Sequence, residues 1–515
     1  MKSFLQRFGR LVIFALSGFD RLRFWGESRL LNNARGVDSY LYAQKVRYTD
    51  FTRHAQDLTD ALCDQTEQQA RREGVPLRYL NSPAIDKEAV ALELAEAHGR
   101  TSGRIALLSC LELGSVYRVR KGTNGWIKPV KERGKCVHYY HYFLHPDSGL
   151  GYVRVQSWFP FAIRVGLNGR NWLCRQLEQR GVAFERRNNL LTAVADPALA
   201  QQLLDEQRRV DWPTLLGNLV QPLQPLWSHL HDCSAPYYWM TEQSEWATDF
   251  VFHSPEALAP WYRRWLKHGI DTLQCQDILR YFGKRAPALC RGEAKVDYRP
   301  RRDGARLKFW YASNSLKIYD KEGCALRIET TINQPRDFRV FRTREGDAEN
   351  GDKAWRILRK GVADLDRRAE VSHAANTRLA ESLATVAESK TLGELLKPLG
   401  RPVRDDQGRR RARPLNPLTG ADGTLLRTLA QGDYLIHGFR NRDIREALHG
   451  PCADAATRRR QAAAVTRQLA LLRQHGLIVK VQNTHRYHLS AAGRRIVTCL
   501  QAAHASDVTR LEAAA

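Results

Sequence analysis

This sequence has no apolar run long enough to cross a bilayer. The run closest to the start, residues 11–16, has six apolar residues, and Arg21, Arg23 and Arg29 follow it. A membrane-spanning helix needs about 20 predominantly apolar residues, so we expect no membrane segment and no membrane partner. Residues 1–35 are better interpreted as a basic amphipathic arm than as a signal peptide, because the apolar run is short and lacks a cleavage site.

Patterned cysteines are also absent. Ten cysteines are spread from Cys63 to Cys499 without a CxxC pair or a repeated spacing. Structural zinc sites and disulfide frameworks use closely spaced or paired cysteines, so neither is predicted. Unpaired thiols suit a reducing compartment, and we expect a cytoplasmic, nucleoid-associated protein.

Acidic residues are scarce relative to basic ones. The 515 residues include 81 Lys and Arg against 55 Asp and Glu, a formal net charge of +26. With 43% hydrophobic residues the chain can bury several cores, so this charge belongs to folded domains. The excess comes from arginine, whose planar fork of donors suits phosphate. The composition predicts a polyanionic partner, with DNA preferred and RNA an alternative.

The C-terminal residues 425–515 carry the clearest local pattern. Val465, Leu469 and Leu472 recur at helical spacing within a helix expected over 457–474. Gly476 stands where a helix end favours positive φ, and a strand over 477–481, a polar tip over 482–486 and a returning strand over 487–489 follow. From Arg401 to Ala515 there are 20 Lys and Arg against 9 Asp and Glu, a difference of +11.

The stretch ALLRQHGLIVKVQNTHRYHLSAAGRRI resembles a winged helix-turn-helix of the MarR-like kind. The resemblance implies that a helix enters the major groove of DNA while the hairpin reaches a neighbouring groove or the backbone. An alternative is a protein-docking module whose arginines are a solvated face. The residues expected to contact nucleic acid here are Arg458, Arg459, Arg460, Arg467, Arg473, Lys480, His485 and Arg486.

The remaining periodicities predict a multi-domain α+β protein, with antiparallel sheets and helices followed by a helical segment and the C-terminal unit. The predicted division is a basic arm (1–35), a helical region (36–102), an α+β meander (103–211), a central α+β domain with an aromatic-rich segment (212–345), a helical segment (346–400), a basic linker (401–424) and the winged helix-turn-helix (425–515).

The central domain contains a hairpin, NSLKIYDKEGCALRIETTIN, over residues 314–333. A three-residue loop at 322–324 would place the apolar residues 316, 318, 326 and 328 on one face. The other face would present a mostly cationic strip. That strip consists of Lys317, Tyr319, Lys321, Arg327 and Glu329.

The same hairpin resembles the YDK and RIE strands of rolling-circle replication initiators. The resemblance implies a DNA-nicking enzyme with a tyrosine nucleophile and a metal held by paired histidines. The His-hydrophobic-His triplet of this sequence is His229-Leu230-His231, which precedes Tyr237 and Tyr238. The central region also resembles an uncharacterised bacterial family, which implies no mechanism.

Other histidines and acids are the remaining candidates for metal binding. His141 and His145 share one side of a predicted strand but stand about 13 Å apart, so packed histidines are favoured over a zinc site. Asp249 enters the apolar run FVF and Glu329 lies on the hairpin; if the protein is an enzyme, these two acids are the predicted catalytic pair, with Mg²⁺ as cofactor.

The sequence therefore predicts a nucleic-acid-binding protein of mobile-element or replication type. One alternative is a metal-dependent nuclease of nicking or transposase-like kind. Another is a non-enzymatic transcriptional regulator in which the large body senses a ligand or forms a homo-oligomer.

Overall fold

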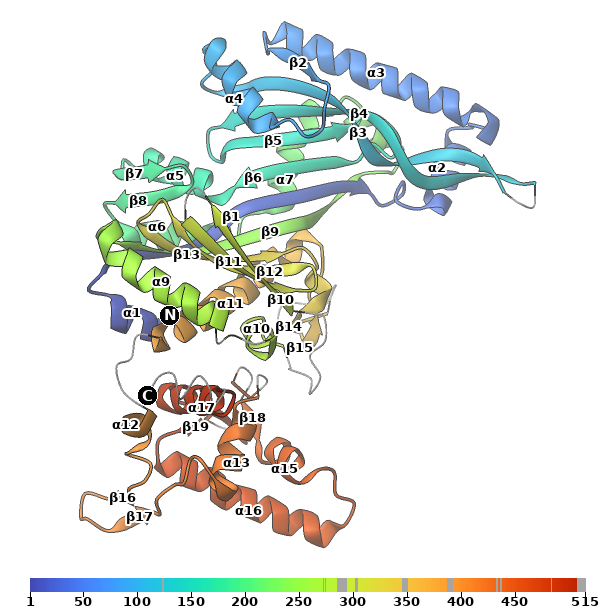
Figure 1. Ribbon diagram of the computed structural model, residues 1–515. Helices are drawn as coiled ribbons and strands as arrows, with labels where there is room; N and C mark the ends of the chain where they lie inside the picture. The colour runs from blue at the N-terminus through green and yellow to red at the C-terminus, as the bar shows by residue number, and fades with distance from the viewer. Residues whose placement is uncertain are drawn as a thin grey trace. The chain divides into compact units, whose positions relative to one another are not determined.

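The computed structural model describes residues 1–122, 125–271, 273, 275–284, 294–301, 304–344, 351–386, 392–431, 434–435, 438–482 and 484–506. Within them the chain folds as a multi-region α+β protein, as the sequence predicts (Figure 1). It divides into two compact units. Unit 1 comprises Met1–Ile13, Phe252–Ile328 and Ala374–Ala515, and unit 2 comprises Phe14–Val251 and Glu329–His373. Each unit thus combines stretches that are far apart in the sequence.

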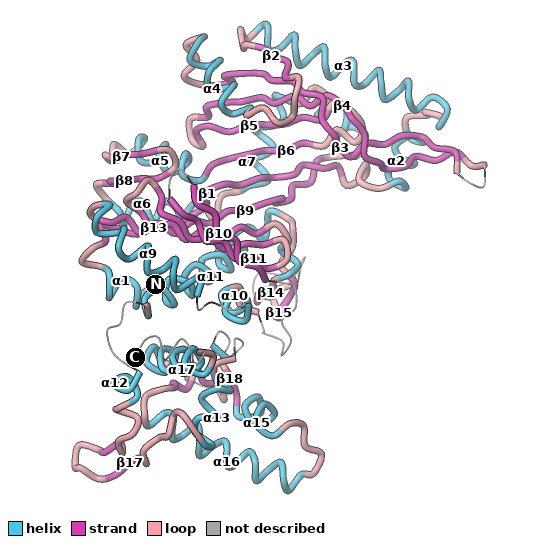
Figure 2. The backbone as a smooth tube through the Cα atoms, viewed as in Figure 1, coloured by secondary structure: helices cyan, strands magenta, loops and turns pink. Residues whose placement is uncertain are grey.

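Unit 2 is built on a large sheet with strand order β13-β9-β1-β6-β5-β4-β3-β2 (Figure 2). These strands are β13 (Ala325–Ile332, entering the unit at Glu329), β9 (Tyr237–Phe252), β1 (Val12–Ser28), β6 (Ile163–Asn168), β5 (Gly149–Gln156), β4 (Ile127–His145), β3 (Gly103–Lys121) and β2 (Leu77–Leu80). Neighbours β1 and β6, and β3 and β4, run antiparallel, whereas β2 and β3 are parallel. Strands β3 to β6 form an antiparallel meander, in which each strand pairs with the next along the chain.

Strand β1 replaces the arm predicted for residues 1–35. It pairs with β6 from Arg21 opposite Asn168 to Gly26 opposite Ile163. Phe14, Leu16, Phe19, Leu22 and Phe24 are buried along it. The short apolar run was therefore the start of a long interior strand, and the basic residues beyond it do not make an amphipathic arm.

Helices pack on this sheet, and capping residues in the sequence mark where two of them begin. They are α2 (Ala34–Ala43), α3 (Phe51–Arg72), α4 (Lys87–Ala97), α5 (Gly169–Gln179), α6 (Pro197–Gln207), α7 (Trp212–Val220) and α8 (Trp227–Asp232). Asp86 caps α4 and Asn168 caps α5 through side-chain oxygens that accept backbone N–H bonds, which satisfies donors at the helix start. A small hairpin, β7 (Phe184–Arg187) and β8 (Leu190–Val194), lies between α5 and α6 in the sequence.

The sequence predicts a helical segment over residues 346–400. The structure differs, because the chain after β13 is only partly helical. It forms a two-stranded hairpin, β14 (Arg339–Arg342) and β15 (Ala354–Ile357), before α11 (Leu365–Thr385) and α12 (Leu392–Leu396). Short 3₁₀ turns, η3 (Pro335–Asp337) and η4 (Val362–Asp364), flank that hairpin.

In unit 1, strands β10 (Ala294–Arg301), β11 (Gly304–Tyr311), β12 (Asn314–Lys321) and the first half of β13 are consecutive. Helix α1 (Lys2–Phe8) packs on α9 (Pro255–Asp271), where the rings of Phe4 and Phe8 lie 5.5 and 5.3 Å from that of Trp265. Helix α10 (Cys275–Tyr281) follows α9. The segment predicted as a linker contains the strand pair β16 (Val403–Arg404) and β17 (Arg410–Ala412).

The last elements follow the predicted order of helices and hairpin. They are α13 (Gly420–Leu429), β18 (Phe439–Arg440), α15 (Asn441–His449), α16 (Ala455–Gln474), β19 (Ile478–Lys480), β20 (Arg486–Leu489) and α17 (Ala491–His504), with sheet order β18-β20-β19. Val465, Leu469 and Leu472 are buried in one core, and Gly476 has φ +69°. The predicted apolar stripe and helix end are therefore confirmed.

Two expectations about composition can be compared with this fold. No helix in the part of the chain that the structure describes has the length and apolarity needed to cross a membrane. Eight cysteines in that part are not disulfide-bonded, whereas Cys275 is.

Candidate functional site

Three carboxylates from neighbouring strands meet in unit 2. Asp20 lies on β1, Glu245 on β9 and Glu329 on β13, and their oxygens lie within 4.8 Å of one another. Asp20 and Glu329 are 4% and 1% exposed, and Glu245 is half-buried. Because the three strands are consecutive in the sheet, side chains at the same level on one face stand side by side. We call these residues the acidic cluster.

The donor chemistry of the acidic cluster fits a hard divalent cation. It is the one group of three or more His, Cys, Asp or Glu in the described ranges whose ligand atoms could surround an ion. All of its donors are carboxylate oxygens, which Mg²⁺, Mn²⁺ and Ca²⁺ prefer, whereas structural zinc is usually held by Cys and His.

Two neighbours moderate the negative charge of the cluster. The Asn189 side-chain amide donates to both oxygens of Asp20, at 2.8 and 3.0 Å. Burial lowers the pKa of the Arg21 guanidinium, but attraction to the carboxylates of the cluster, Glu245 most strongly, outweighs this and raises that pKa. The cluster therefore acts as a local negative centre within a strongly basic chain.

Asp249, which the sequence predicts to act together with Glu329, does not join the acidic cluster. Its Oδ2 accepts a bond from Arg170 Nη2 at 2.9 Å, and both side chains are buried. Asp249 follows Glu245 by four residues on β9, which places it about 13 Å further along the strand. Of the two predicted acids, Glu329 therefore belongs to the candidate site and Asp249 does not. The other two acids of the site are Asp20 and Glu245.

Sequence reasoning missed Asp20 because residues 1–35 were interpreted as an arm. A usable signal was present, since Asp20 interrupts a long run of apolar residues in the same way as Asp249 interrupts the end of β9. An acid inside an interior strand is costly to bury, so it indicates a partner or a function.

The hairpin of β12 and β13 has the predicted loop at residues 322–324 and the predicted apolar face. Leu316, Ile318, Leu326 and Ile328 are fully buried. Its other face is not an exposed cationic strip, because Arg327 is fully buried and Lys317, Tyr319 and Lys321 are half-buried. Every residue of β13 is buried, as expected for a strand covered on both faces, so the predicted nucleic-acid contact of Arg327 is wrong.

The paired-histidine site implied by the rolling-circle resemblance does not form at His229 and His231. Both lie on helix α8, where residues two apart point in different directions and cannot bind one ion together. The His229 Nε2 instead lies 3.0 Å from the Tyr40 hydroxyl, which is also 3.1 Å from His54 Nε2. These contacts make His229 part of the packing of unit 2.

The predicted basic residues of the C-terminal elements are largely on the surface. Arg458, Arg459, Arg460, Arg467 and Arg473 of α16 are all exposed, as are Lys480 and His485, whereas Arg486 is half-buried. Among the residues that the structure describes, no carboxylate forms an ion pair with any of the five arginines of α16. Val465, Leu469 and Leu472 occupy the buried side of this helix, and Arg460 and Arg467, seven residues apart, lie on the opposite side.

Comparisons with known proteins add little to this geometry. No protein-family model matches the chain, and no curated protein matches it. A solved structure similar to the chain is that of the rolling circle replication initiator protein from Geobacillus stearothermophilus, with 10% sequence identity and a TM-score of 0.20. The alignment covers 63% of this chain and 76% of that chain. A TM-score this low carries no argument, so function must be inferred from the residues themselves.

Proposed function

We propose that this chain is a nucleic-acid-binding protein of replication or mobile-element type that contacts duplex DNA through residues 420–504. The observation that carries this proposal is the exposure of five arginines on α16, none of which forms an ion pair with a carboxylate in the described part of the chain. An unneutralised cationic helix releases counterions when it binds phosphates, and this release drives affinity.

The arrangement of the elements supports this mode of contact. Helix α16 has one apolar side in the core and one free side, and a helix of this kind fits the major groove. Lys480 and His485 are exposed on β19 and at the adjoining hairpin tip, where they could reach the DNA backbone. The order of helices and hairpin is the one expected of a winged helix-turn-helix, which the sequence resembles.

The test removes charge from α16 in the full chain. We expect Arg460→Ala with Arg467→Ala to weaken binding of a labelled duplex and to reduce the slope of log affinity against log salt by about 1.8, since each lost phosphate contact accounts for about 0.9. The charge-matched control is Arg71→Ala with Arg180→Ala, on exposed sites of unit 2. Equal losses in the two double variants would show that general charge, and not α16, is responsible.

A second candidate function is divalent-cation-dependent cleavage of a nucleic-acid strand in unit 2. The acidic cluster favours it, because Asp20, Glu245 and Glu329 fit a hard divalent cation. A cation bound there would supply Lewis-acid activation of a phosphodiester. The protein's own contribution is to hold three carboxylates on adjacent strands, with Asn189 fixing the orientation of Asp20.

This second candidate is tested with labelled single-stranded and duplex DNA, with and without Mg²⁺ or Mn²⁺. We expect cation-dependent cleavage by the native chain, and loss of cleavage with retained DNA binding in Asp20→Asn and Glu329→Gln. Asp249→Asn serves as the control for a buried acid on β9 outside the cluster. Binding without cleavage under every condition would instead support a non-enzymatic regulator.

A further inference from the structure

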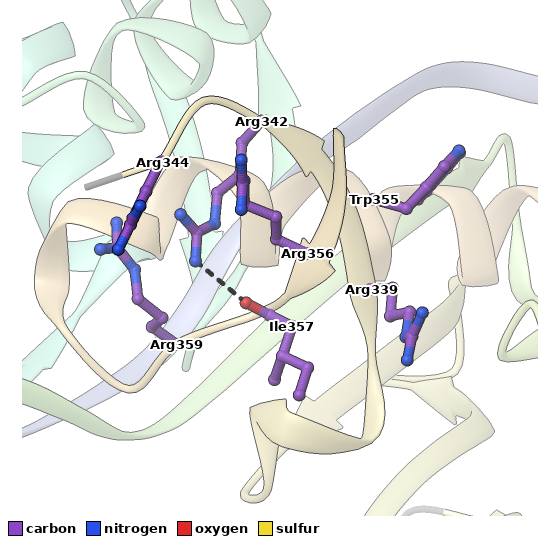
Figure 3. A pocket seen from close by; sticks show the side chains of 7 residues that line it. All are labelled: Arg339, Arg342, Arg344, Trp355, Arg356, Ile357 and Arg359. Atoms are coloured by element: carbon purple, nitrogen blue, oxygen red, sulfur yellow. Dashed lines mark hydrogen bonds between the residues drawn. The ribbon is translucent and has the colours of Figure 1, made fainter. Parts of the chain in front are cut away.

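The hairpin of β14 and β15 in unit 2 carries a concentration of arginine that the proposed function does not use. It borders a cavity of about 550 Å³. The side chains that matter around this cavity are Arg339, Arg342, Arg344, Arg356 and Arg359, together with Trp355. Figure 3 shows Arg342, Arg344, Arg356 and Arg359 gathered on one side of the hairpin, while Trp355 and Arg339 project from the other.

This separation follows from the strand register. Phe341 is opposite Trp355, and Arg342 is opposite Ala354. Directly opposed residues of an antiparallel pair lie on one face, and the faces alternate along each strand. One face of the hairpin therefore carries Phe341 and Trp355 together with Arg339, and the other face carries Arg342 and Arg356.

One buried acid balances only part of this charge. Asp364 is fully buried and accepts bonds from Arg359 at 3.1 Å through each of its oxygens. Arg342 Nε lies 3.7 Å from the same carboxylate, and its Nη2 donates to the backbone oxygen of Ile357 at 3.2 Å. Burial raises the pKa of Asp364, but the hydrogen bonds of Arg359 outweigh this and lower it, so the acid is ionised.

Within the described ranges, no ion pair joins a carboxylate to Arg339, Arg344 or Arg356. Burial lowers the pKa of Arg342; attraction to Asp364 opposes this, but repulsion from neighbouring guanidinium groups, including those of Arg359 and Arg356, adds to the lowering. Binding of an anion from outside the protein would offset this repulsion.

The opposite face offers a stacking surface. The side chains of Phe341 and Trp355 are 57% and 53% exposed, and their ring centroids are 5.8 Å apart. Stacking of unpaired bases on such rings contributes substantially to single-strand binding.

We propose that the β14–β15 hairpin binds single-stranded nucleic acid, its arginines holding backbone phosphates while Trp355 and Phe341 stack on unpaired bases. The cavity of about 550 Å³ lies in the size range of sites for small ligands. The proposal rests on the proposed function, since it names single-stranded nucleic acid as the partner of unit 2.

The test measures binding of the full chain to fluorescein-labelled oligothymidylate and oligouridylate of about 20 nucleotides, and to a duplex. We expect Trp355→Ala to weaken oligonucleotide binding roughly 5- to 150-fold, the range for loss of one stacked base, and Trp355→Phe to retain most of it. The matched control is Trp126→Ala, whose ring is 75% exposed elsewhere in unit 2. Arg339→Ala with Arg344→Ala should lower the salt slope by about 1.4.

The outcomes separate this proposal from the proposed function. Weaker single-strand binding in the hairpin variants with unchanged duplex binding supports the hairpin site, and the ratio of the two oligonucleotides shows whether DNA or RNA is preferred. If the α16 variants leave duplex binding intact while the hairpin variants lose single-strand binding, the duplex proposal fails and this one stands. Unchanged single-strand affinity in Trp355→Ala and in the arginine double variant overturns it, as does a loss equal to that of the Trp126→Ala or Arg71→Ala/Arg180→Ala controls.

Discussion

Replacing Glu329 by Gln should stabilise the cation-free protein while removing its response to divalent cations. The substitution keeps the shape of the side chain and removes one negative charge from the acidic cluster. Glu329 and Asp20 are nearly fully buried, and carboxylate oxygens of the two lie within 4.8 Å. Two like charges at this distance repel each other, and burial limits screening by solvent.

The magnitude follows from Coulomb's law. Two unit charges 4.8 Å apart interact by about 3 kcal/mol at an effective dielectric constant of roughly 20. Arg21 and the Asn189 amide offset part of this repulsion, so we expect a net gain of about 1–2 kcal/mol for Glu329→Gln without cations. In a folded unit of this size, that gain corresponds to a rise in Tm of roughly 2–8 °C.

The assay is thermal unfolding of the full chain in EDTA and in increasing Mg²⁺ or Mn²⁺. The native protein should be stabilised by about 2.7 kcal/mol when the cation is at 100 times its Kd, and Glu329→Gln should show little of this effect. Glu242→Gln is the matched control, because Glu242 lies on β9 but pairs with Arg164 at 2.8 Å. A lower Tm of Glu329→Gln in EDTA together with an intact cation response would refute the reasoning.

Three further expectations concern stability. Asp249→Ala should lower the free energy of unfolding in urea by about 3–5 kcal/mol, because it leaves Arg170 charged and buried. The variant should still be stabilised by divalent cations. Loss of that stabilisation would mean that Asp249 does belong to the site. Burial lowers the pKa of His138 to about 4 and of His141 to about 3, so the unfolded chain, with a histidine pKa near 6.5, binds more protons at intermediate pH. Their contribution to the free energy of unfolding is therefore complete above about pH 6.5 and declines towards pH 4. The urea midpoint should fall as the pH is lowered across this range, and it should fall less in His138→Leu. If the midpoint of His138→Leu depended on pH in the same way as that of the native protein, the assignment would be contradicted. Gly476→Ala should destabilise the C-terminal elements by about 1–2 kcal/mol, because φ is +69°, a conformation that alanine disfavours. An added Cβ meets no atom within 4 Å, so no steric clash adds to this cost. An unchanged urea midpoint would show that the backbone relaxes.

Local patterns in the sequence were sufficient to predict most elements of the C-terminal region and several helix starts. Val465, Leu469 and Leu472 share one side of a helix wherever that helix lies, and Gly476 ends it through its own backbone preference. Asn168 caps α5 through bonds to residues two and three positions away. These features depend on neighbours in the chain, so sequence reasoning reaches them.

The candidate site depended on contacts that no local pattern contains. Asp20, Glu245 and Glu329 converge only because β1, β9 and β13 are consecutive strands, and the choice of neighbouring strand is made between segments far apart in the sequence. The same pairing buries Arg327, which alternation alone would leave in solvent. The sequence by itself determined the basic charge, the α+β class and the amphipathic α16. Only the tertiary structure decided which acids meet and which cations stay exposed, because strand order and burial are set by the whole packed chain.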